Sequence, residues 1–258
     1  MPGTQRVVLI TGGSGGLGRA LARLFAQNGS RVVVTSRNKD RLEAVAAEIN
    51  REGGQVLALS CDVGQKDEVE RLAMDVENNV GSVQVLINNA GIAPAISFLE
   101  MPDSLWHEVL RVNLSGTYNC CKTFLPAMIR SGWGRIINIA STTAKVAYSH
   151  VSAYTSSKHG VLGLTRSLAL ESAKSGVTVN AICPGYLDTE LTHKSAALMA
   201  QKTGKTAAEV INIFARTSPQ NRLIAPEEVA SLALLLASEK AAGITGQAIN
   251  VDGGAVMI

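Results

Sequence analysis

The chain has 258 residues, of which 46% are hydrophobic and 17% charged, and its 24 Lys and Arg nearly balance its 21 Asp and Glu. This composition excludes intrinsic disorder, because the apolar content is high and the net charge of +3 is small. The sequence has no cluster of Lys and Arg of the kind that indicates a nucleic-acid-binding surface. The apolar run near the N-terminus is too short for a signal peptide or a membrane span. We therefore expect a single domain, residues 1–258, located in the cytoplasm, that binds neither nucleic acid nor a membrane.

Metal-ligating and aromatic residues give no further pattern. The cysteines and histidines lack metal-ligand spacing, and the cysteines do not form a disulfide framework, so we expect reduced, buried thiols and no metal (Cys61, Cys120, Cys121 and Cys183; His107, His150, His159 and His193). Trp106 and Trp133 flank helical stretches and are expected to pack rather than to bind a ligand.

Short apolar runs alternate with longer amphipathic stretches along the chain. The apolar runs predict strands at 7–10, 31–34, 56–59, 83–87, 135–139, 177–182 and 248–251. Apolar residues at helical spacing predict helices at 18–27, 41–50, 66–80, 105–130, 153–173 and 226–237. The strands are apolar on both faces, as in a parallel sheet covered by helices on each side. This alternation predicts a doubly wound α/β fold with about seven parallel strands, in which ligands bind outside the carboxyl ends of the strands.

A glycine-rich turn follows the first predicted strand and leads directly into the first helix. Glycines permit a tight turn, and they let backbone N–H groups at a helix N-terminus approach a pyrophosphate. An ordinary flexible turn would have a similar composition, but the strand before it and the helix after it favour a dinucleotide site. The residues expected there are Gly12, Ser14, Gly15, Gly16, Leu17 and Gly18.

The end of the second strand is where such a fold reads the adenosine ribose of the dinucleotide. A carboxylate there would accept hydrogen bonds from both ribose hydroxyls and would repel a 2′-phosphate. This chain has Ser36 and Arg37 instead, a hydroxyl and a guanidinium that suit a phosphomonoester. The pair favours NADP(H) over NAD(H), and the alternative is that Arg37 is only a solvated residue before a helix.

A tyrosine and a lysine stand four residues apart in the helix predicted at 153–173. This spacing puts Tyr154 and Lys158 on one face, where the ammonium is expected to lower the pKa of the phenol so that it can exchange a proton with a carbonyl oxygen. Ser141 follows the strand predicted at 135–139, at a carboxyl end where its hydroxyl can hold that same oxygen.

Together these motifs resemble the short-chain dehydrogenase/reductase family, in its compact single-domain branch. The resemblance runs from about residue 6 to the C-terminus and implies a Rossmann-type fold and an NAD(P)-dependent oxidoreductase that interconverts a ketone and a secondary alcohol. It rests on Thr11-Gly12 with Gly16 and Gly18, Asn88-Asn89-Ala90-Gly91, Asn113, Ser141, Tyr154 with Lys158, and Pro184-Gly185.

The resemblance also implies a role for individual residues. Tyr154 would donate or accept the proton, and Ser141 would orient the substrate oxygen. Lys158 would bind the nicotinamide ribose, and Asn113 would position a water that links Lys158 to solvent. Further coenzyme contacts would come from Asp62, Val63, Asn89, Ala90, Gly91, Pro184, Gly185, Leu187 and Thr189.

One position departs from the family pattern. Many NADP-dependent relatives place a basic residue just before the middle glycine of the first motif, where this chain has Gly15. The preference for NADP(H) therefore rests on Arg37, with help from Ser36.

The region 188–223 breaks the regular alternation. It contains two helix-like pieces, 196–201 and 207–214, around a break at Thr203-Gly204-Lys205. Because it follows the motif that would face the nicotinamide, we expect a segment that closes over the substrate and excludes water. A fixed helical hairpin is the alternative.

The substrate pocket is the part that the sequence defines least. The residues expected near it are mostly apolar: Ala93, Pro94, Ala95, Ala144, Val146, Tyr186 and Leu191. Ser141 and Tyr154 are expected to hold the substrate oxygen, and His150, which lies between them in the sequence, is expected at the pocket wall. Similarity to 3-oxoacyl thioester reductases and polyketide ketoreductases favours a 3-oxoacyl thioester or a related ketone.

Two other functions remain open at this point. One is an NAD-dependent dehydrogenase of secondary alcohols or polyols. The other is a non-catalytic, nucleotide-sensing module, although such a protein would be expected to lose Tyr154, Lys158 or Ser141, which this chain keeps. The family resemblance implies a homotetramer.

Overall fold

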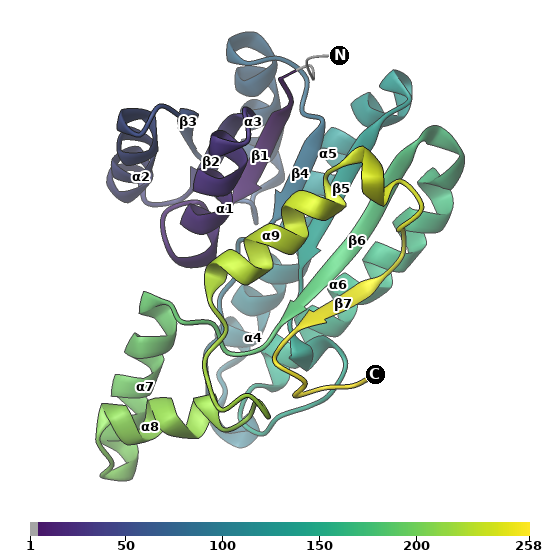
Figure 1. The fold of residues 1–258 in the computed structure, drawn as a ribbon. Coiled ribbons are helices and arrows are strands. Elements are labelled where there is room, and N and C mark those ends of the chain that lie inside the picture. Colours follow the sequence, from purple (N-terminus) through teal and green to yellow (C-terminus); the bar gives the residue numbers. More distant parts are fainter. Residues whose placement is uncertain (1–4) are drawn as a thin grey trace.

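The computed structural model describes residues 5–258 and confirms the doubly wound architecture (Figure 1). Seven parallel strands form one sheet in the order β3-β2-β1-β4-β5-β6-β7. All seven predicted strands are present, each within two residues of its predicted ends: β1 (Val7–Thr11), β2 (Arg31–Ser36), β3 (Gln55–Ser60), β4 (Val85–Asn88), β5 (Gly134–Ile139), β6 (Val177–Pro184) and β7 (Ala248–Val251).

The order of the strands reverses between β1 and β4. From β1 the chain first adds β2 and β3 on one side, and it then adds β4 to β7 on the other. Val8 of β1 is accordingly paired with Val32 on one side and Val85 on the other. The connections that leave β1 and β4 at their carboxyl ends diverge to opposite faces, which opens a crevice for a ligand at this point.

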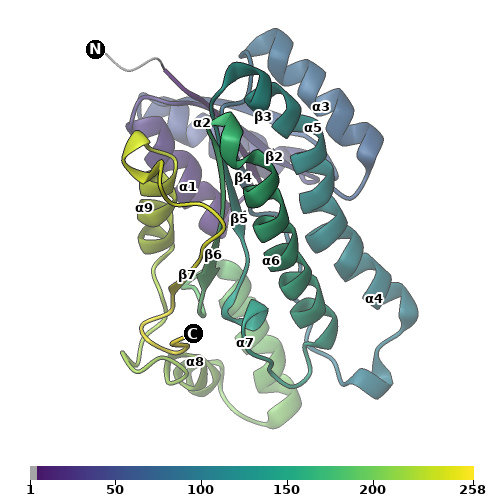
Figure 2. The ribbon, with the colours of Figure 1, turned by 90° about the vertical axis from the view of Figure 1, so that its right-hand side faces the viewer.

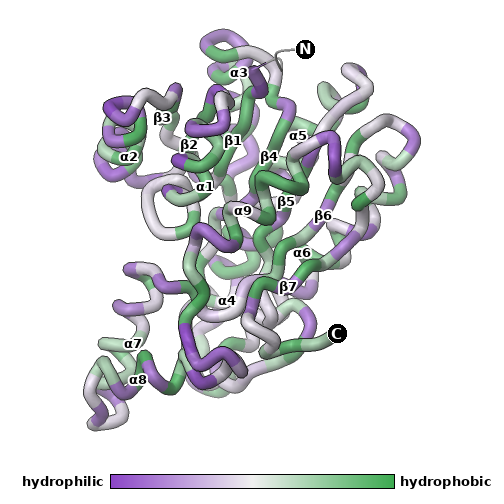
Figure 3. The backbone as a smooth tube through the Cα atoms, in the orientation of Figure 1, coloured by the Kyte–Doolittle hydropathy of each residue, from purple (hydrophilic) through white to green (hydrophobic). Residues whose placement is uncertain are grey.

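Helices cover both faces of the sheet, as the view along its edge shows (Figure 2). Side chains of β1 alternate between the two layers, with Val8 and Ile10 in one apolar core and Val7 and Leu9 in the other. The strands are accordingly hydrophobic along most of their length (Figure 3). One face carries α1 (Gly16–Gln27), α2 (Lys39–Arg51) and α9 (Pro226–Leu236), and the other carries α3 (Lys66–Asn79), α5 (Gly116–Ser131) and α6 (Ser152–Ser172).

The helix predicted at 105–130 is interrupted by one π-helical turn. α4 (Asp103–Leu110) continues through Arg111–Ser115, which has π geometry, into α5. A π turn holds one extra residue and rotates the following helix, yet it leaves the apolar spacing on each side intact, so periodicity does not reveal it. This turn contains Asn113.

Two helices project from the body of the molecule (Figure 1). α7 (Glu190–Thr203) and α8 (Ala207–Ala215) correspond to the two predicted pieces of the region 188–223, and α7 begins six residues earlier than expected. Gly204 ends α7 in the left-handed conformation, and Thr206 and Glu209 form a capping box that starts α8. The pair buries a small apolar cluster of its own, made of Ala196, Ala200, Val210 and Phe214.

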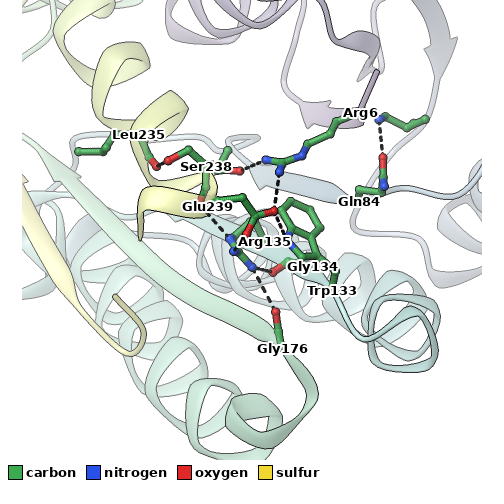
Figure 4. A network of polar contacts seen from close by, with 11 residues as sticks. Arg6, Gln84, Trp133, Gly134, Arg135, Gly176, Leu235, Ser238 and Glu239 are labelled. Atoms are coloured by element: carbon green, nitrogen blue, oxygen red, sulfur yellow. Dashed lines mark hydrogen bonds and ion pairs between the residues drawn. The ribbon is translucent and has the colours of Figure 1, made fainter. Parts of the chain in front are cut away.

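A polar network closes the amino ends of the strands (Figure 4). Trp133 contacts two guanidinium groups, with Arg6 at 4.1 Å and Arg135 at 4.3 Å from its ring centre. Its indole N–H donates to Glu239 at 2.8 Å. Trp133 thus packs rather than binds, as expected, and the network lies at the end of the sheet opposite to the ligand crevice.

Candidate active site

A cleft of about 390 Å³ opens at the carboxyl ends of the strands. It brings together most of the predicted site residues, from five separate segments of the chain. The predicted residues that line it are Gly12, Ser14, Gly15, Gly16, Leu17, Gly18, Asn89, Ala90, Gly91, Ala93, Ser141, Tyr154, Lys158, Pro184, Gly185, Leu187 and Thr189.

The glycine turn is packed tightly against the chain that follows β4. Gly12 has φ +69°, and a Cβ there would lie 2.9 Å from the Cα of Ala90. The side chain of Asn89 donates to the carbonyl oxygens of Thr11 and Gly12, at 2.9 and 3.2 Å. Any larger residue at position 12 would push these two segments apart. Asn89 therefore shapes the cleft through its side-chain hydrogen bonds to the turn.

Ser141 is positioned to donate a hydrogen bond into the cleft. It lies in extended conformation after β5, and its Oγ accepts from the backbone N–H of Thr143 at 3.1 Å. A hydroxyl has one proton to donate, and this contact does not use it. The Ser141 hydroxyl also forms a hydrogen bond with Tyr154 that favours the ionised phenol.

Lys158 lies one helical turn beyond Tyr154 in α6 and is almost fully buried. Its ammonium donates to the carbonyl oxygen of Ile139 at 2.7 Å and lies over the face of the Tyr154 ring, 5.7 Å from the ring centre. Burial lowers the pKa of Lys158 to about 8.

The expected decrease in the Tyr154 pKa is not what this geometry produces. Burial raises the pKa of Tyr154 above its usual value, and the hydrogen bond with Ser141 offsets only part of that increase. Of the neighbouring side chains, only Ser141 lowers this pKa, whereas the Lys158 ammonium donates to the Ile139 carbonyl. The sequence-based expectation for the Tyr154 pKa was therefore wrong.

Asn113 lies next to the cleft rather than in its wall. Its side chain is fully buried and makes paired hydrogen bonds with the backbone of Ile92, accepting from the N–H at 2.8 Å and donating to the C=O at 2.9 Å. It also donates to Ser157 Oγ at 3.0 Å. These contacts attach the π turn to the strand end that lines the cleft and to α6. The water-binding role of Asn113 stays a prediction.

The residues predicted for the adenosine end lie outside the lining of the cleft. Arg37 is exposed and pairs with Glu108 at 3.4 Å. The Asp62 carboxylate accepts from the backbone N–H of Gly64 and pairs with Arg111 at 3.0 Å. The two remaining residues make backbone contacts: the Ser36 hydroxyl with Asn38, and the Val63 carbonyl with Asn119. Contacts of all four with adenosine stay predictions.

Three charged residues that the sequence did not mark as site residues also line the cleft: Arg41, Glu190 and Lys194. Glu190 pairs with both cations, each at 2.6 Å. Each lies at an exposed helix position, where charged residues are common, so composition and spacing gave no reason to single them out. The available signal was the position of Arg41 in the first turn of the helix that follows β2.

Of the predicted substrate residues, Ala93 lines the cleft, whereas Val146, His150 and Tyr186 lie beyond it. His150 has φ +66°, and its carbonyl accepts from the N–H of Ile96 at 2.7 Å, which joins the loops after β4 and β5. Tyr186 stacks on Phe214 of α8, with ring centres 4.4 Å apart. Roles for these three in substrate binding remain predictions.

Neither a membrane-crossing helix nor a metal site occurs in residues 5–258. No helix in this range is long and apolar enough to span a bilayer. No group of three or more His, Cys, Asp or Glu side chains there could hold a metal ion. All four cysteines are buried and unpaired with one another.

The chain has extensive similarity to known proteins. A family model described as short chain dehydrogenase matches residues 6–200. The chain is 39% identical to a D-beta-hydroxybutyrate dehydrogenase of Rhizobium meliloti, covering 96% of this chain and 98% of that protein. It is 37% identical to a 3-oxoacyl acyl-carrier-protein reductase of Aquifex aeolicus, covering 96% of each.

A solved structure supports the same assignment. The crystal structure of an actinorhodin polyketide ketoreductase variant with NADPH superposes with a TM-score of 0.94 at 36% identity, covering 97% of each chain. Fold, cleft and sequence similarity thus agree. The chain belongs to the short-chain dehydrogenase/reductase family and is an NAD(P)-dependent oxidoreductase.

Proposed function

We propose that this enzyme reduces the ketone of a 3-oxoacyl thioester, or a related apolar ketone, with NADP(H) as coenzyme and Tyr154 as proton donor. The observation that carries the proposal is the convergence of Ser141, Tyr154 and Lys158 in a cleft that the glycine turn also lines. The names of the relatives, a hydroxybutyrate dehydrogenase and a 3-oxoacyl reductase, support a substrate oxygenated at the third carbon.

The residues fit a dinucleotide. The glycine turn at the start of α1 provides backbone N–H groups for a pyrophosphate. Gly91 lets the chain pass close to Asn113 and Lys158, since a Cβ at that position would lie 3.2 Å from Asn113 Oδ1 and 3.7 Å from Lys158 Nζ. The coenzyme, when bound, supplies the hydride chemistry. Lys158 would hold the nicotinamide ribose, and the segment 184–189 would line the nicotinamide side.

Ser141 and Tyr154 then bind the substrate oxygen and transfer a proton to it. The Ser141 hydroxyl donates a hydrogen bond to the carbonyl and orients it. Tyr154 keeps its proton at neutral pH, because burial raises its pKa, and gives it up as negative charge develops on that oxygen. In the direction of oxidation the phenol must first lose its proton, and the phenolate oxygen then receives the proton of the substrate alcohol.

The preference for NADP(H) depends on Ser36 and Arg37 at the end of β2. A guanidinium binds a 2′-phosphate through two hydrogen bonds, and no carboxylate stands at these two positions to bind the ribose hydroxyls. We expect a lower KM for NADPH than for NADH, and the reverse after Arg37→Asp. A wild type that prefers NADH would overturn this part of the proposal.

An NAD-dependent alcohol dehydrogenase is the second candidate. One observation favours it: Glu108 lies 3.4 Å from Arg37 and would oppose a 2′-phosphate there. Initial rates with 3-oxoacyl thioesters, cyclic ketones, polyols and sugars, each with both coenzymes, separate the two. Highest kcat/KM for a polyol with NAD⁺ would replace the first proposal by the second.

Two further features complete the proposal. The region 188–223 covers the bound substrate, so its cleavage by trypsin should slow when coenzyme and substrate analogue are added; unchanged cleavage would support a fixed hairpin. The active assembly is a homotetramer, which sedimentation at micromolar concentration tests; a monomer would contradict it.

A further inference from the structure

An ion pair joins the coenzyme side of the cleft to the substrate-covering segment. Arg41 Nη2 lies 2.6 Å from one carboxylate oxygen of Glu190, and Lys194 Nζ lies 2.6 Å from the other. Arg41 belongs to the first turn of α2, and Glu190 begins α7. All three side chains line the cleft. One carboxylate is therefore shared by a cation of α2 and a cation of its own helix.

The guanidinium of Arg41 lies beside the glycine turn. A Cβ at Gly15 would be 3.5 Å from Arg41 Nη2, and a Cβ at Gly16 would be 3.5 Å from the methyl carbon of Thr189. Arg41 thus stands between the N-terminus of α1 and the end of β2, where the adenosine ribose is read. Arg41 can therefore supply a second guanidinium to a phosphate on that ribose from within the cleft lining, in addition to Arg37 at the end of β2.

The covering segment leaves and rejoins the body at one fixed point. Leu187 and Ile224 form an isolated parallel bridge, with the N–H of Asp188 donating to Ile224 at 2.9 Å. The N–H of Ile224 donates to the carbonyl of Tyr186 at 2.8 Å. α7 begins three residues after this bridge, at Glu190. The contact with Arg41 therefore restrains the first turn of α7, directly after the bridge between Leu187 and Ile224.

We propose that Glu190 is an internal competitor for the 2′-phosphate of NADP(H), and that Arg41 changes partner from Glu190 to this phosphate. The inference rests on the proposed preference for NADP(H) and deepens it. A phosphate dianion binds a guanidinium through two charge-assisted hydrogen bonds, which exceeds the strength of a half-exposed carboxylate pair. Glu190, once released, keeps its pair with Lys194, so the exchange leaves no carboxylate without a partner.

The choice between NADP(H) and NAD(H) then determines how firmly the first turn of α7, in the region 188–223, is held against α2. NADP(H) frees the first turn of α7 from α2, whereas NAD(H), which has no 2′-phosphate, leaves the Arg41–Glu190 pair in place. Glu190 thus acts on coenzyme choice through Arg41 as a positioning residue, without touching the reacting atoms.

Binding measurements on the purified enzyme test the competition. Glu190→Gln is expected to lower the Kd for NADPH by about two- to fivefold, because the competing charge is gone, and to leave the Kd for NADH unchanged. Arg41→Gln is expected to raise the Kd for NADPH by about tenfold, again with little effect on NADH. Glu227→Gln and Arg51→Gln are matched controls, since they make the same charge changes at exposed helix positions outside the cleft lining.

Hydrogen exchange tests the coupling with two small probes. Adenosine 2′,5′-bisphosphate carries the 2′-phosphate and 5′-AMP does not. Adenosine 2′,5′-bisphosphate is expected to speed hydrogen exchange in the peptide covering 190–198, whereas 5′-AMP is not. In the Glu190→Gln variant the two compounds should have the same effect. Equal effects of the two probes would overturn the coupling.

The failures of the two proposals can be told apart. A wild type with a lower Kd for NADH than for NADPH removes the NADP(H) preference and this inference with it. A wild type that prefers NADPH, but whose Kd is unchanged by Glu190→Gln, keeps the preference and overturns only the role of Glu190. A variant Arg41→Gln that weakens both coenzymes equally would place Arg41 on the pyrophosphate instead.

Discussion

The ammonium of Lys158 lies over the ring of Tyr154, 5.7 Å from its centre, and donates its hydrogen bond to the carbonyl of Ile139. Lys158 is buried and Tyr154 is partly buried, and desolvation shifts their pKa values in opposite directions, upward for the phenol and down to about 8 for the ammonium. The phenol therefore keeps its proton at neutral pH, which suits a proton donor in ketone reduction.

Removal of the phenol hydroxyl should stop the reaction without disturbing the coenzyme site. We expect Tyr154→Phe to lower kcat by about 10²- to 10⁴-fold, the usual contribution of a positioned general acid. The Kd for the coenzyme should hardly change, because the ring and its packing remain. Steady-state rates and coenzyme fluorescence measure the two quantities. Tyr118→Phe, at an exposed position on α5, is the control, and substantial turnover by Tyr154→Phe would refute the assignment.

The lowered pKa of Lys158 predicts how stability depends on pH. Its folded pKa is about 8, below the ordinary value of about 10.5, so between these values the unfolded chain binds more protons than the folded one. Lys158 therefore makes the folded state more stable as pH rises from about 8 to about 10.5. Below about pH 8 the full free-energy penalty of burying its charged ammonium is present.

The replacement Lys158→Met isolates this effect. The variant cannot titrate at this position, so its stability relative to wild type should be greatest near neutral pH and should fall by at least about 1 kcal/mol as pH rises to about 10. Urea unfolding at several pH values measures the difference, in which other titrating groups cancel. Parallel pH curves for the two proteins would contradict the prediction.

The sequence predicted the strands and most of the cleft because their signals are local. Ser141, for instance, directly follows an apolar run, and the carboxyl ends of parallel strands meet at one edge of the sheet. The contact between Tyr154 and Lys158 is likewise set by helical spacing alone.

The sequence does not predict features that depend on contacts between residues far apart in the chain. Arg41 and Glu190 are 149 positions apart and sit on solvated helix surfaces. The direction of the Tyr154 pKa depends on burial by residues from several elements and on where the Lys158 ammonium points. A one-residue insertion of π geometry at 111–115 leaves the apolar pattern unchanged.

Asn113 connects this π turn to the coenzyme cleft, and its removal should affect both stability and binding. Asn113→Ala leaves the partly buried backbone N–H and C=O of Ile92 without their partners, which we expect to cost about 1–3 kcal/mol in free energy of unfolding. The chain from Gly91 onward should also become less ordered, so the Kd for coenzyme should rise. Urea unfolding and coenzyme titration measure the two effects. Asn79→Ala, at the exposed end of α3, is the control, and unchanged stability of Asn113→Ala would contradict the role.

The network at the amino ends of the strands should contribute to stability but not to activity. The Arg135 side chain is 2% exposed, burial lowers the pKa of its guanidinium, and Glu239 is its ion-pair partner at 3.5 Å. Glu239 also binds Arg6 and Trp133, each at 2.8 Å. Because a buried cation that loses its carboxylate remains desolvated, Glu239→Gln should lower the free energy of unfolding by about 1–2 kcal/mol.

A double-mutant cycle separates this contribution from general damage. In an Arg135→Met background no buried cation remains, so Glu239→Gln should cost clearly less than in the wild type, and the coupling should be at least about 0.5 kcal/mol. The kcat/KM of every variant that folds should match the wild type, because Arg135 and Glu239 belong to the network at the amino ends of the strands and neither lines the cleft. Additive effects in the cycle would show that Glu239 stabilises the fold through Arg6 and Trp133 rather than through the buried guanidinium.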